Sequence, residues 1–195
     1  MVNLYTKEET YYFTDKNEEE NTLKVLEISR EYALKNDIKS IIVASTRGRV
    51  ASKLLDFFDP TTFNLIVVTH SCWFRPNIKQ EFDSKVLSSL NKKGVKVVTA
   101  AHALGGVCRA VGRRFGGIPL TVLIADVLRL FCEGVKVAVE ITLMATDAGY
   151  VNPGEEVISI GGTGRGADTA LVITAAPSEM FFDLKIKKVL AKPVF

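Results

Sequence analysis

The stretch Ile41-Ile42-Val43-Ala44-Ser45-Thr46-Arg47-Gly48-Arg49-Val50-Ala51 joins a short apolar run to the start of a helical pattern. The apolar run predicts a buried strand over residues 40–44, and the residues that follow predict a helix over 49–58. Two hydroxyls, two arginines and one glycine therefore lie where a buried strand gives way to a helix. A strand that leads directly into a helix is the repeating unit of α/β folds, which makes this stretch the best single indicator of the fold class.

The same alternation of apolar runs and helical patterns continues on both sides of this stretch. Before it, Asn17 and Glu20 have the spacing of a helix-capping box, which predicts an N-terminal helix over about 17–36. After it, the patterns predict strands over 63–69, 95–100, 156–160 and 169–174 and helices over 79–92, 120–131 and 133–148. Strands that alternate with helices predict a doubly wound parallel sheet with helices on both faces.

The last part of the chain modifies this parallel sheet. The loop over residues 161–167 is too short for a crossover, so we expect the two strands that it joins to be antiparallel and the sheet to be mixed. Alternating Phe182, Leu184 and Ile186 predict a further edge strand at about 182–190. The glycine-rich segment 105–117 fits neither pattern. Because no linker divides the chain, we expect one domain over residues 1–195.

Composition argues against several classes of protein. A net charge of +3 over 195 residues is too small for the concentrated basic face of a nucleic-acid binder, so we expect no nucleic-acid partner. No apolar stretch reaches the ~20 residues that span a membrane, and residues 1–5 lack a secretion-signal pattern, so we expect no membrane partner and a cytoplasmic location. Cys72, Cys108 and Cys132 have neither zinc nor disulfide spacing, so we expect no metal site.

The turn between the strand and the helix has the residues of a phosphate-binding site. The first turn of a helix offers free N–H groups and a partial positive charge. Ser45 and Thr46 can add hydroxyl donors, Arg47 and Arg49 can add charged donors, and Gly48 lets the backbone approach closely. The alternative is that Ser45 or Thr46 only caps the helix while both arginines are solvated.

Other polar residues are expected to lie at the same edge of the sheet. Ligands of open α/β sheets bind beyond the carboxyl ends of the strands, where Thr69 and His70 end one predicted strand and His102 follows another. The loop Gly161-Gly162-Thr163-Gly164-Arg165 joins this edge if its strand is parallel to strand 40–44. Its N–H groups could cradle an anion, or its glycines could only supply the positive φ of a mobile hairpin.

Three residues are candidates for acid–base chemistry. His70 and His102 each either contact a ligand as general acid or base or are hydrogen-bonded structural histidines. Glu140 lies in an otherwise apolar helix. It either faces the site or lies, as we expect, on a solvent-facing stripe with Lys136, four residues earlier.

A few further residues could support a ligand or a neighbour. Arg109, Arg113 and Arg114 could contact a phosphorylated ligand or another subunit, or could simply be solvated. Trp73 and Phe74 could stack on an aromatic ring, or could have an ordinary packing role.

Two of these segments carry a family resemblance. The turn over residues 45–51 and the segment over 151–164 (VNPGEEVISIGGTG) are similar to the C-terminal α/β domain of pyruvate kinase, and more so to small, mostly archaeal stand-alone relatives of that domain. The resemblance implies a three-layer α/β/α sandwich with a mixed five-stranded sheet whose last strand is antiparallel. It implies phosphate binding at residues 45–49, with flavin mononucleotide (FMN) as the cofactor, and, because no catalytic barrel is present, no pyruvate kinase activity.

Three functions follow as hypotheses. The first is a binding protein for a phosphorylated small molecule, most simply FMN, at the carboxyl edge of the sheet. The second is an enzyme, flavin-dependent or phosphate-handling, that uses the same pocket through His70, His102 or Glu140. The third is a regulatory or oligomerisation module without a small ligand, because the resembling domain lies at subunit contacts in pyruvate kinases. Whether the protein is an enzyme and whether it forms a homo-oligomer are left open by the sequence.

Overall fold

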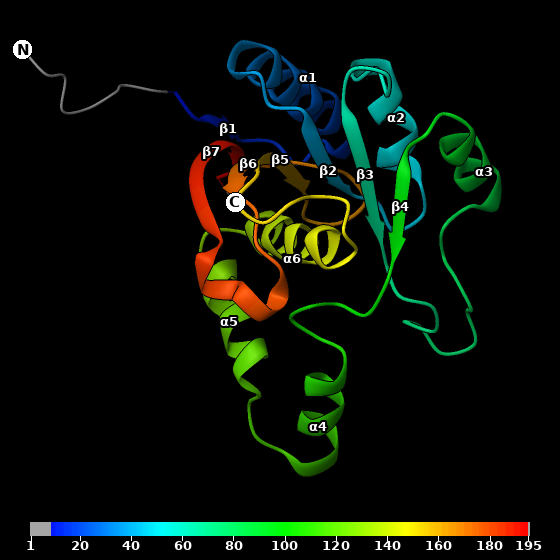
Figure 1. Ribbon diagram of the computed structural model, residues 1–195. Helices are drawn as coiled ribbons and strands as arrows, with labels where there is room; N and C mark the ends of the chain where they lie inside the picture. The colour runs from blue at the N-terminus through cyan, green and yellow to red at the C-terminus, as the bar shows by residue number, and fades with distance from the viewer. Residues whose placement is uncertain (1–8, 195) are drawn as a thin grey trace, which may run out of the picture.

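Seven strands form one sheet in the computed structural model (Figure 1). The structure describes residues 9–194. The segment Met1–Tyr5, for which we expect no secretion signal, lies outside the described residues. The strands are β1 (Tyr11–Phe13), β2 (Ser40–Ala44), β3 (Asn64–Thr69), β4 (Lys96–Thr99), β5 (Glu156–Gly161), β6 (Thr169–Thr174) and β7 (Lys185–Pro193). The helices are α1 (Glu18–Asn36), α2 (Arg49–Phe57), α3 (Ser84–Lys92), α4 (Val107–Phe115), α5 (Leu120–Arg129) and α6 (Glu133–Asp147), with a 3₁₀ helix η1 (Ser178–Asp183).

The strand order, β1-β7-β6-β5-β2-β3-β4, confirms the mixed sheet and corrects its size. Strands β2, β3, β4 and β5 are parallel, and β6 is antiparallel to β5, as the short glycine loop predicts. The predicted number of five strands is wrong. Strand β7 continues the sheet antiparallel to β6, and β1 pairs parallel with β7. The strand expected at the edge therefore lies inside the sheet. The edge is formed by β1, which at three residues is too short to show an alternating pattern.

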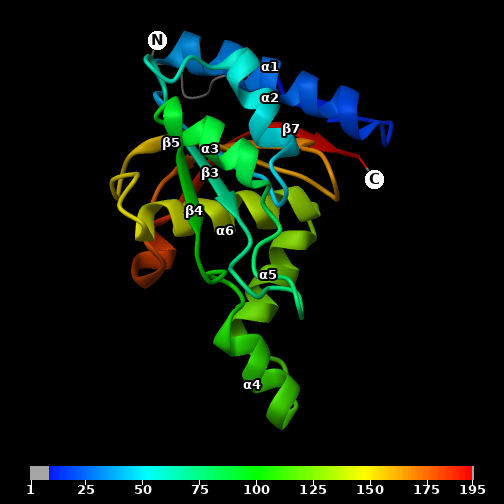
Figure 2. The same cartoon turned by 90° about the vertical axis from the view of Figure 1, so that its right-hand side faces the viewer.

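Helices cover both faces of the sheet (Figure 2). Because side chains alternate along a strand, Ile41 and Val43 of β2 pack with α1 and α2, whereas Ile42 packs with α6 on the opposite face. The same alternation in β3, β5 and β6 produces one apolar layer on each side of the sheet. The predicted three-layer α/β/α sandwich is confirmed.

Two other predictions differ from the structure in their bounds. Helix α3 begins at Ser84 rather than at residue 79, because the Gln80 side chain accepts the N–H groups of Glu81 and Phe82 and holds that segment as a loop. Asp83 then caps the helix. The predicted strand at 182–190 is shifted to β7, because Phe182 lies in η1, where its side chain is exposed.

The glycine-rich segment that fits no pattern forms helix α4, which begins after Gly106 and ends before Gly116, both at positive φ. Residues 105–131, which contain α4 and α5, project from the sandwich in both views and are called the helical arm below (Figures 1 and 2). None of the helices within residues 9–194 combines the length and the apolar character needed to cross a membrane.

Candidate functional site

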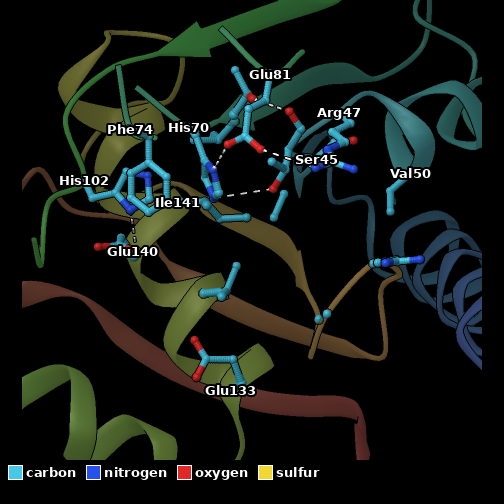
Figure 3. Close-up of a pocket in the computed structure, with 18 of the residues that line it drawn as sticks. Ser45, Arg47, Val50, His70, Phe74, Glu81, His102, Glu133, Glu140 and Ile141 are labelled. Carbon is cyan, nitrogen blue, oxygen red and sulfur yellow. Dashed lines mark hydrogen bonds and ion pairs between the residues drawn. The ribbon is translucent and has the colours of Figure 1, made fainter. Parts of the chain in front are cut away.

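A cavity lies at the carboxyl ends of the parallel strands, as expected for an open α/β sheet. Its volume is about 640 Å³, within the range of small-molecule sites. Figure 3 shows side chains from the turn after β2, the loop after β3 and helix α6 around one hollow, here called the rim cavity. Its polar lining residues include Ser45, Thr46, Arg47, Arg49, Thr69, His70, Arg75, Glu81, His102, Arg109, Arg129, Glu133, Lys136, Glu140 and Arg165.

Ser45 and Gly48 shape the turn that opens helix α2. The N–H of Ser45 donates to the carbonyl of Val68 at 3.0 Å, which ties the turn to β3. The hydroxyl of the buried Ser45 accepts the N–H of Ala51 at 3.3 Å, so it pairs one of the otherwise free N–H groups of the first turn. Gly48 is the N-cap residue, with φ +95°, a conformation that favours glycine. Gly48 does not itself line the rim cavity.

The two arginines of the turn lie at the cavity. The turn therefore combines the helix-start hydrogen bond of Ser45 with a cationic surface, so the two interpretations of the sequence do not exclude each other. Arg47 and Arg49 are both exposed and both line the rim cavity. Val50 lines it too, and the first N–H groups of a helix have no partner within the helix. The turn therefore combines two guanidinium groups with the positive end of α2.

Thr46 connects the turn to the next strand. The Thr69 hydroxyl donates to the carbonyl oxygen of Thr46 at 3.0 Å, and the Thr46 hydroxyl lies 3.4 Å from Nε2 of His70. Both threonines and His70 line the rim cavity. The predicted residues at the ends of β2 and β3 are thus brought together.

Glu81 is the main residue of this site that the sequence does not indicate. Its side chain is only 5% exposed, and its carboxylate lies 3.0 Å from Nδ1 of His70, 3.2 Å from Arg75 and 3.7 Å from Arg47. Burial by itself raises the pKa of Glu81, but the hydrogen bond from His70 and the charges of Arg75, His70 and Arg47 lower it below its usual range. Glu81 therefore stays ionised and orients the cationic side chains around it.

A group of rings forms a second part of the lining. Phe74 is stacked on His102 with a ring-centre distance of 4.9 Å and lies 4.1 Å from the ring centre of His70. The Arg109 guanidinium lies over the Phe74 ring at 5.3 Å. Figure 3 shows the three rings side by side between Glu81 and Glu140. Flat rings beside cationic donors suit a ligand that has both an aromatic ring and an anionic group.

Glu140 is buried, so its predicted place on a solvent-facing stripe is wrong. Its side chain is 6% exposed, and that of Lys136, with which it is hydrogen-bonded, is 10% exposed. The other carboxylate oxygen accepts the N–H of Leu104 at 3.0 Å. Because α6 packs across the sheet and under the loop after β4, the face that carries Lys136 and Glu140 is covered by protein.

His102 lies beside this buried pair, with Nδ1 3.7 Å from the Glu140 carboxylate. Burial lowers the pKa of His102 to about 4, against the opposing charge of Glu140 and with help from His70, Lys136 and Arg109. His102 is therefore neutral at pH 7. Each histidine of the chain thus has a carboxylate neighbour, a pairing that their positions in the sequence do not indicate.

The glycine loop after β5 contributes only part of its predicted residues. Gly162, Gly164 and Arg165 line the rim cavity, whereas Gly161 and Thr163 do not. Gly161 ends β5 against α6, and Thr163 lines a separate cavity of about 190 Å³. A Cβ on Gly161 would lie 2.5 Å from the carbonyl oxygen of Gly134, so this glycine has a packing role.

Two N–H groups of this loop already have carboxylate partners. The Thr163 N–H donates to Asp168 at 3.1 Å, and the Arg165 N–H donates to Glu18 at 3.2 Å. The loop is thus held against the start of α1, and its anion-cradling capacity rests on the Arg165 side chain more than on its backbone.

The rim cavity is strongly cationic. Seven Arg or Lys residues and three Glu residues line it, whereas the whole chain has 25 of the first kind and 22 Asp or Glu. Such an excess in a concave site attracts anions. Within residues 9–194, His, Cys, Asp and Glu side chains form no group of three that could hold a metal ion.

The chain belongs to the family of the pyruvate kinase alpha/beta domain, whose model matches residues 23–173. One solved structure to which the chain is similar is a pyruvate kinase from Cryptosporidium parvum, with 14% sequence identity and a TM-score of 0.36. That match covers 74% of this chain and 21% of the pyruvate kinase. The chain therefore spans about a fifth of the length of that enzyme.

Proposed function

We propose that the protein binds a phosphorylated small molecule with an aromatic ring system in the rim cavity, and that FMN is the ligand to test first. The observation that carries this proposal is the juxtaposition, in one cavity, of a cationic helix-opening turn and a cluster of flat rings. Because both features line one concave cavity of small-molecule size, a small metabolite suits it better than a macromolecular partner.

The phosphate end of the ligand is assigned to the turn after β2. Arg47, Arg49 and Arg165 supply charged donors, and the start of α2 supplies backbone N–H groups. Glu81 stands behind Arg47 at 3.7 Å and limits the directions that its guanidinium can take. A preorganised guanidinium costs less entropy on binding than a freely rotating one.

The ring end of the ligand is assigned to the side of the cavity formed by His70, Phe74 and His102. His102, which is neutral, and Phe74 carry no charge that would lose its hydration when a ring binds beside them. The donor set and the volume of about 640 Å³ fit a mononucleotide-sized ligand. FMN, if bound, would supply the redox chemistry of its isoalloxazine ring.

The test is a titration of the purified protein with FMN and with riboflavin, which lacks the phosphate, followed by flavin fluorescence. Replacing Arg47 and Arg49 together by alanine removes charged hydrogen bonds of about 1.5–3 kcal/mol each, so FMN affinity should fall at least tenfold. Riboflavin affinity should change much less. Arg30→Ala, an exposed arginine on α1 outside the cavity lining, is the matched control.

Two results would reject parts of the proposal. Equal losses of FMN and riboflavin affinity in the double variant would contradict a phosphate role for the turn. No binding of FMN would remove the flavin, and mass spectrometry of small molecules released from the native protein would then identify another phosphorylated ligand or none.

A second candidate function is catalysis in the same cavity, favoured by the two histidine–carboxylate pairs. His70 with Glu81 and His102 with Glu140 each place an imidazole that faces the cavity beside a buried acid. Proton transfer to or from a bound ligand is the chemistry that such pairs support. An activity that survives replacement of His70, His102 and Glu140 together would reject these assignments.

A further inference from the structure

The helical arm carries the largest concentration of exposed apolar side chains in the described part of the chain. Nine of its large apolar residues are between 47% and 83% exposed: Val107, Val111, Phe115, Ile118, Leu120, Leu123, Val127, Leu130 and Phe131. Helix α4 buries no residue, and α5 buries only Ala125. At on the order of 100 Å² each, these side chains expose roughly 900 Å², against roughly 300–600 Å² for the largest patch of an ordinary monomer.

The spacing of these residues indicates that the missing partner is helical. Leu120, Leu123, Val127 and Leu130 follow one another at intervals of three, four and three residues, the pattern of a seam between packed helices. The opposite face of α5 is already used, because Ala125 and its neighbours pack with Leu143 of α6. A helix with apolar residues on both faces is normally covered on both.

The two ends of the arm have opposite charges beside them. At the tip, α4 ends with the exposed Arg113 and Arg114. At the base, η1 packs into the same small core as α5 through Phe181 and presents the exposed acidic residues Glu179 and Asp183. The exposed Lys185 that follows η1 donates to the carbonyl of Phe182. A surface that is basic at one end and acidic at the other is complementary to a second copy of itself turned by 180°.

We propose that two copies of this chain associate through their helical arms, antiparallel about a two-fold axis, to form a four-helix bundle. The tip of each arm then lies against η1 of the other copy, with Arg113 and Arg114 facing Glu179 and Asp183. The exposed Phe182 of η1 adds to the apolar contact. The available area matches the roughly 800 Å² per partner of a standard interface.

A second copy suits the arm better than a lipid surface. A hairpin that dips into a membrane needs apolar residues at its tip and polar ones toward its base. Here Leu130 and Phe131 at the base are 83% and 60% exposed, and Phe115 and Ile118 near the tip are 80% and 76% exposed. The apolar surface therefore runs along the whole arm, as side-by-side helix packing requires.

Sedimentation equilibrium of the full chain over a wide concentration range tests the proposal, which expects a dimer for the native sequence. Leu123→Asp with Val127→Asp should weaken association at least a hundredfold. Leu34→Asp, at an exposed leucine of α1, is the matched control and should leave the dimer unchanged. Far-UV circular dichroism and thermal unfolding of each variant establish that the monomers are folded.

Reversing the charges at the tip and at η1 tests the arrangement of the dimer independently of the apolar variant. Arg113→Glu with Arg114→Glu should weaken the dimer at least tenfold, as should Glu179→Lys with Asp183→Lys. All four changes in one chain should restore it, because each tip meets the base of the other copy. A native chain that remains monomeric overturns the proposal. Co-sedimentation of that monomer with anionic vesicles would then indicate that the arm binds a lipid surface instead. The proposal is also overturned by a dimer unaffected by Leu123→Asp with Val127→Asp, or by four reversals that weaken it further.

Discussion

Glu81 illustrates how much of this site depends on single residues far apart in the chain. A buried carboxylate beside His70, Arg75 and Arg47 holds three cationic or titratable groups at one edge of the cavity. Without this partner, Arg47 and Arg75 would lose the carboxylate that orients them, and His70 would lose the carboxylate beside its Nδ1. Nothing in the local sequence marks Glu81, because it lies in an irregular loop whose path is set by tertiary contacts.

The buried His102 makes stability depend on pH in a defined direction. Its pKa in the folded state is about 4, below the 6.5 of an exposed imidazole, so between these values the unfolded chain binds more protons. Stability should therefore fall as the pH is lowered from 7 to 5, by about 2 kcal/mol from this group. Urea unfolding of the native chain and of His102→Gln at both pH values measures this.

The variant should show a smaller loss of unfolding free energy between pH 7 and pH 5 than the native chain. The range stops at pH 5 because the lowered pKa of Glu81 adds its own loss of stability only as the pH falls below the usual range of a carboxyl. Equal slopes for the two chains would show that His102 is not kept neutral by burial.

At the scale of elements, the unit β2–turn–α2 depends on one glycine. Gly48 has φ +95°, and a Cβ there would lie 2.9 Å from Cγ1 of Val86 on α3. The turn therefore requires glycine for two reasons, backbone conformation and the close approach of α3. Gly94, after α3, has φ +78° with nothing within 4 Å of a built Cβ, so it isolates the first reason.

Gly48→Ala should lower the free energy of unfolding by about 2–3 kcal/mol, and Gly94→Ala by about 1 kcal/mol. Chemical denaturation of both variants measures the difference, which reports the contact with Val86. Equal losses in the two variants would mean that α3 moves away from the turn without cost.

Element prediction from sequence succeeded where periodicity was strong and failed where it was weak. The buried strands β2 and β3 and the capped helix α1 lie within a residue or two of their predicted bounds. Helix α4 was not predicted, because it contains a glycine and exposes its apolar residues. Strand β1 is only three residues long, and such a segment has too few side chains to show alternation.

At the scale of the whole molecule, strand β1 joins the two ends of the described chain. Tyr11, Tyr12 and Phe13 pair with residues 191–193 of β7, and Phe13 packs against the core under α1. Its neighbour Tyr12 is 58% exposed. Among the side chains of β1, Phe13 should therefore contribute most to the stability of the pairing between β1 and β7.

Phe13→Ala should destabilise the protein by about 1–2 kcal/mol, because a half-buried ring is lost, whereas Tyr12→Ala should cost less than about 0.5 kcal/mol. Thermal or urea unfolding compares the two. Similar effects of the two variants would show that β1 is held by its backbone bonds rather than by Phe13.

The sequence by itself determined the α/β class, the mixed sheet with an antiparallel strand after the short glycine loop, and the cationic turn of residues 45–49. These features depend on residues that are close together in the sequence, so their periodicity, capping and charge can be recognised from the sequence alone. Only the tertiary structure decided the ionic partners of Arg47 and the two histidines, the burial of Glu140 and the projection of the arm. Each of these depends on which segments meet in space, and the free energy of such contacts leaves no local pattern in the chain.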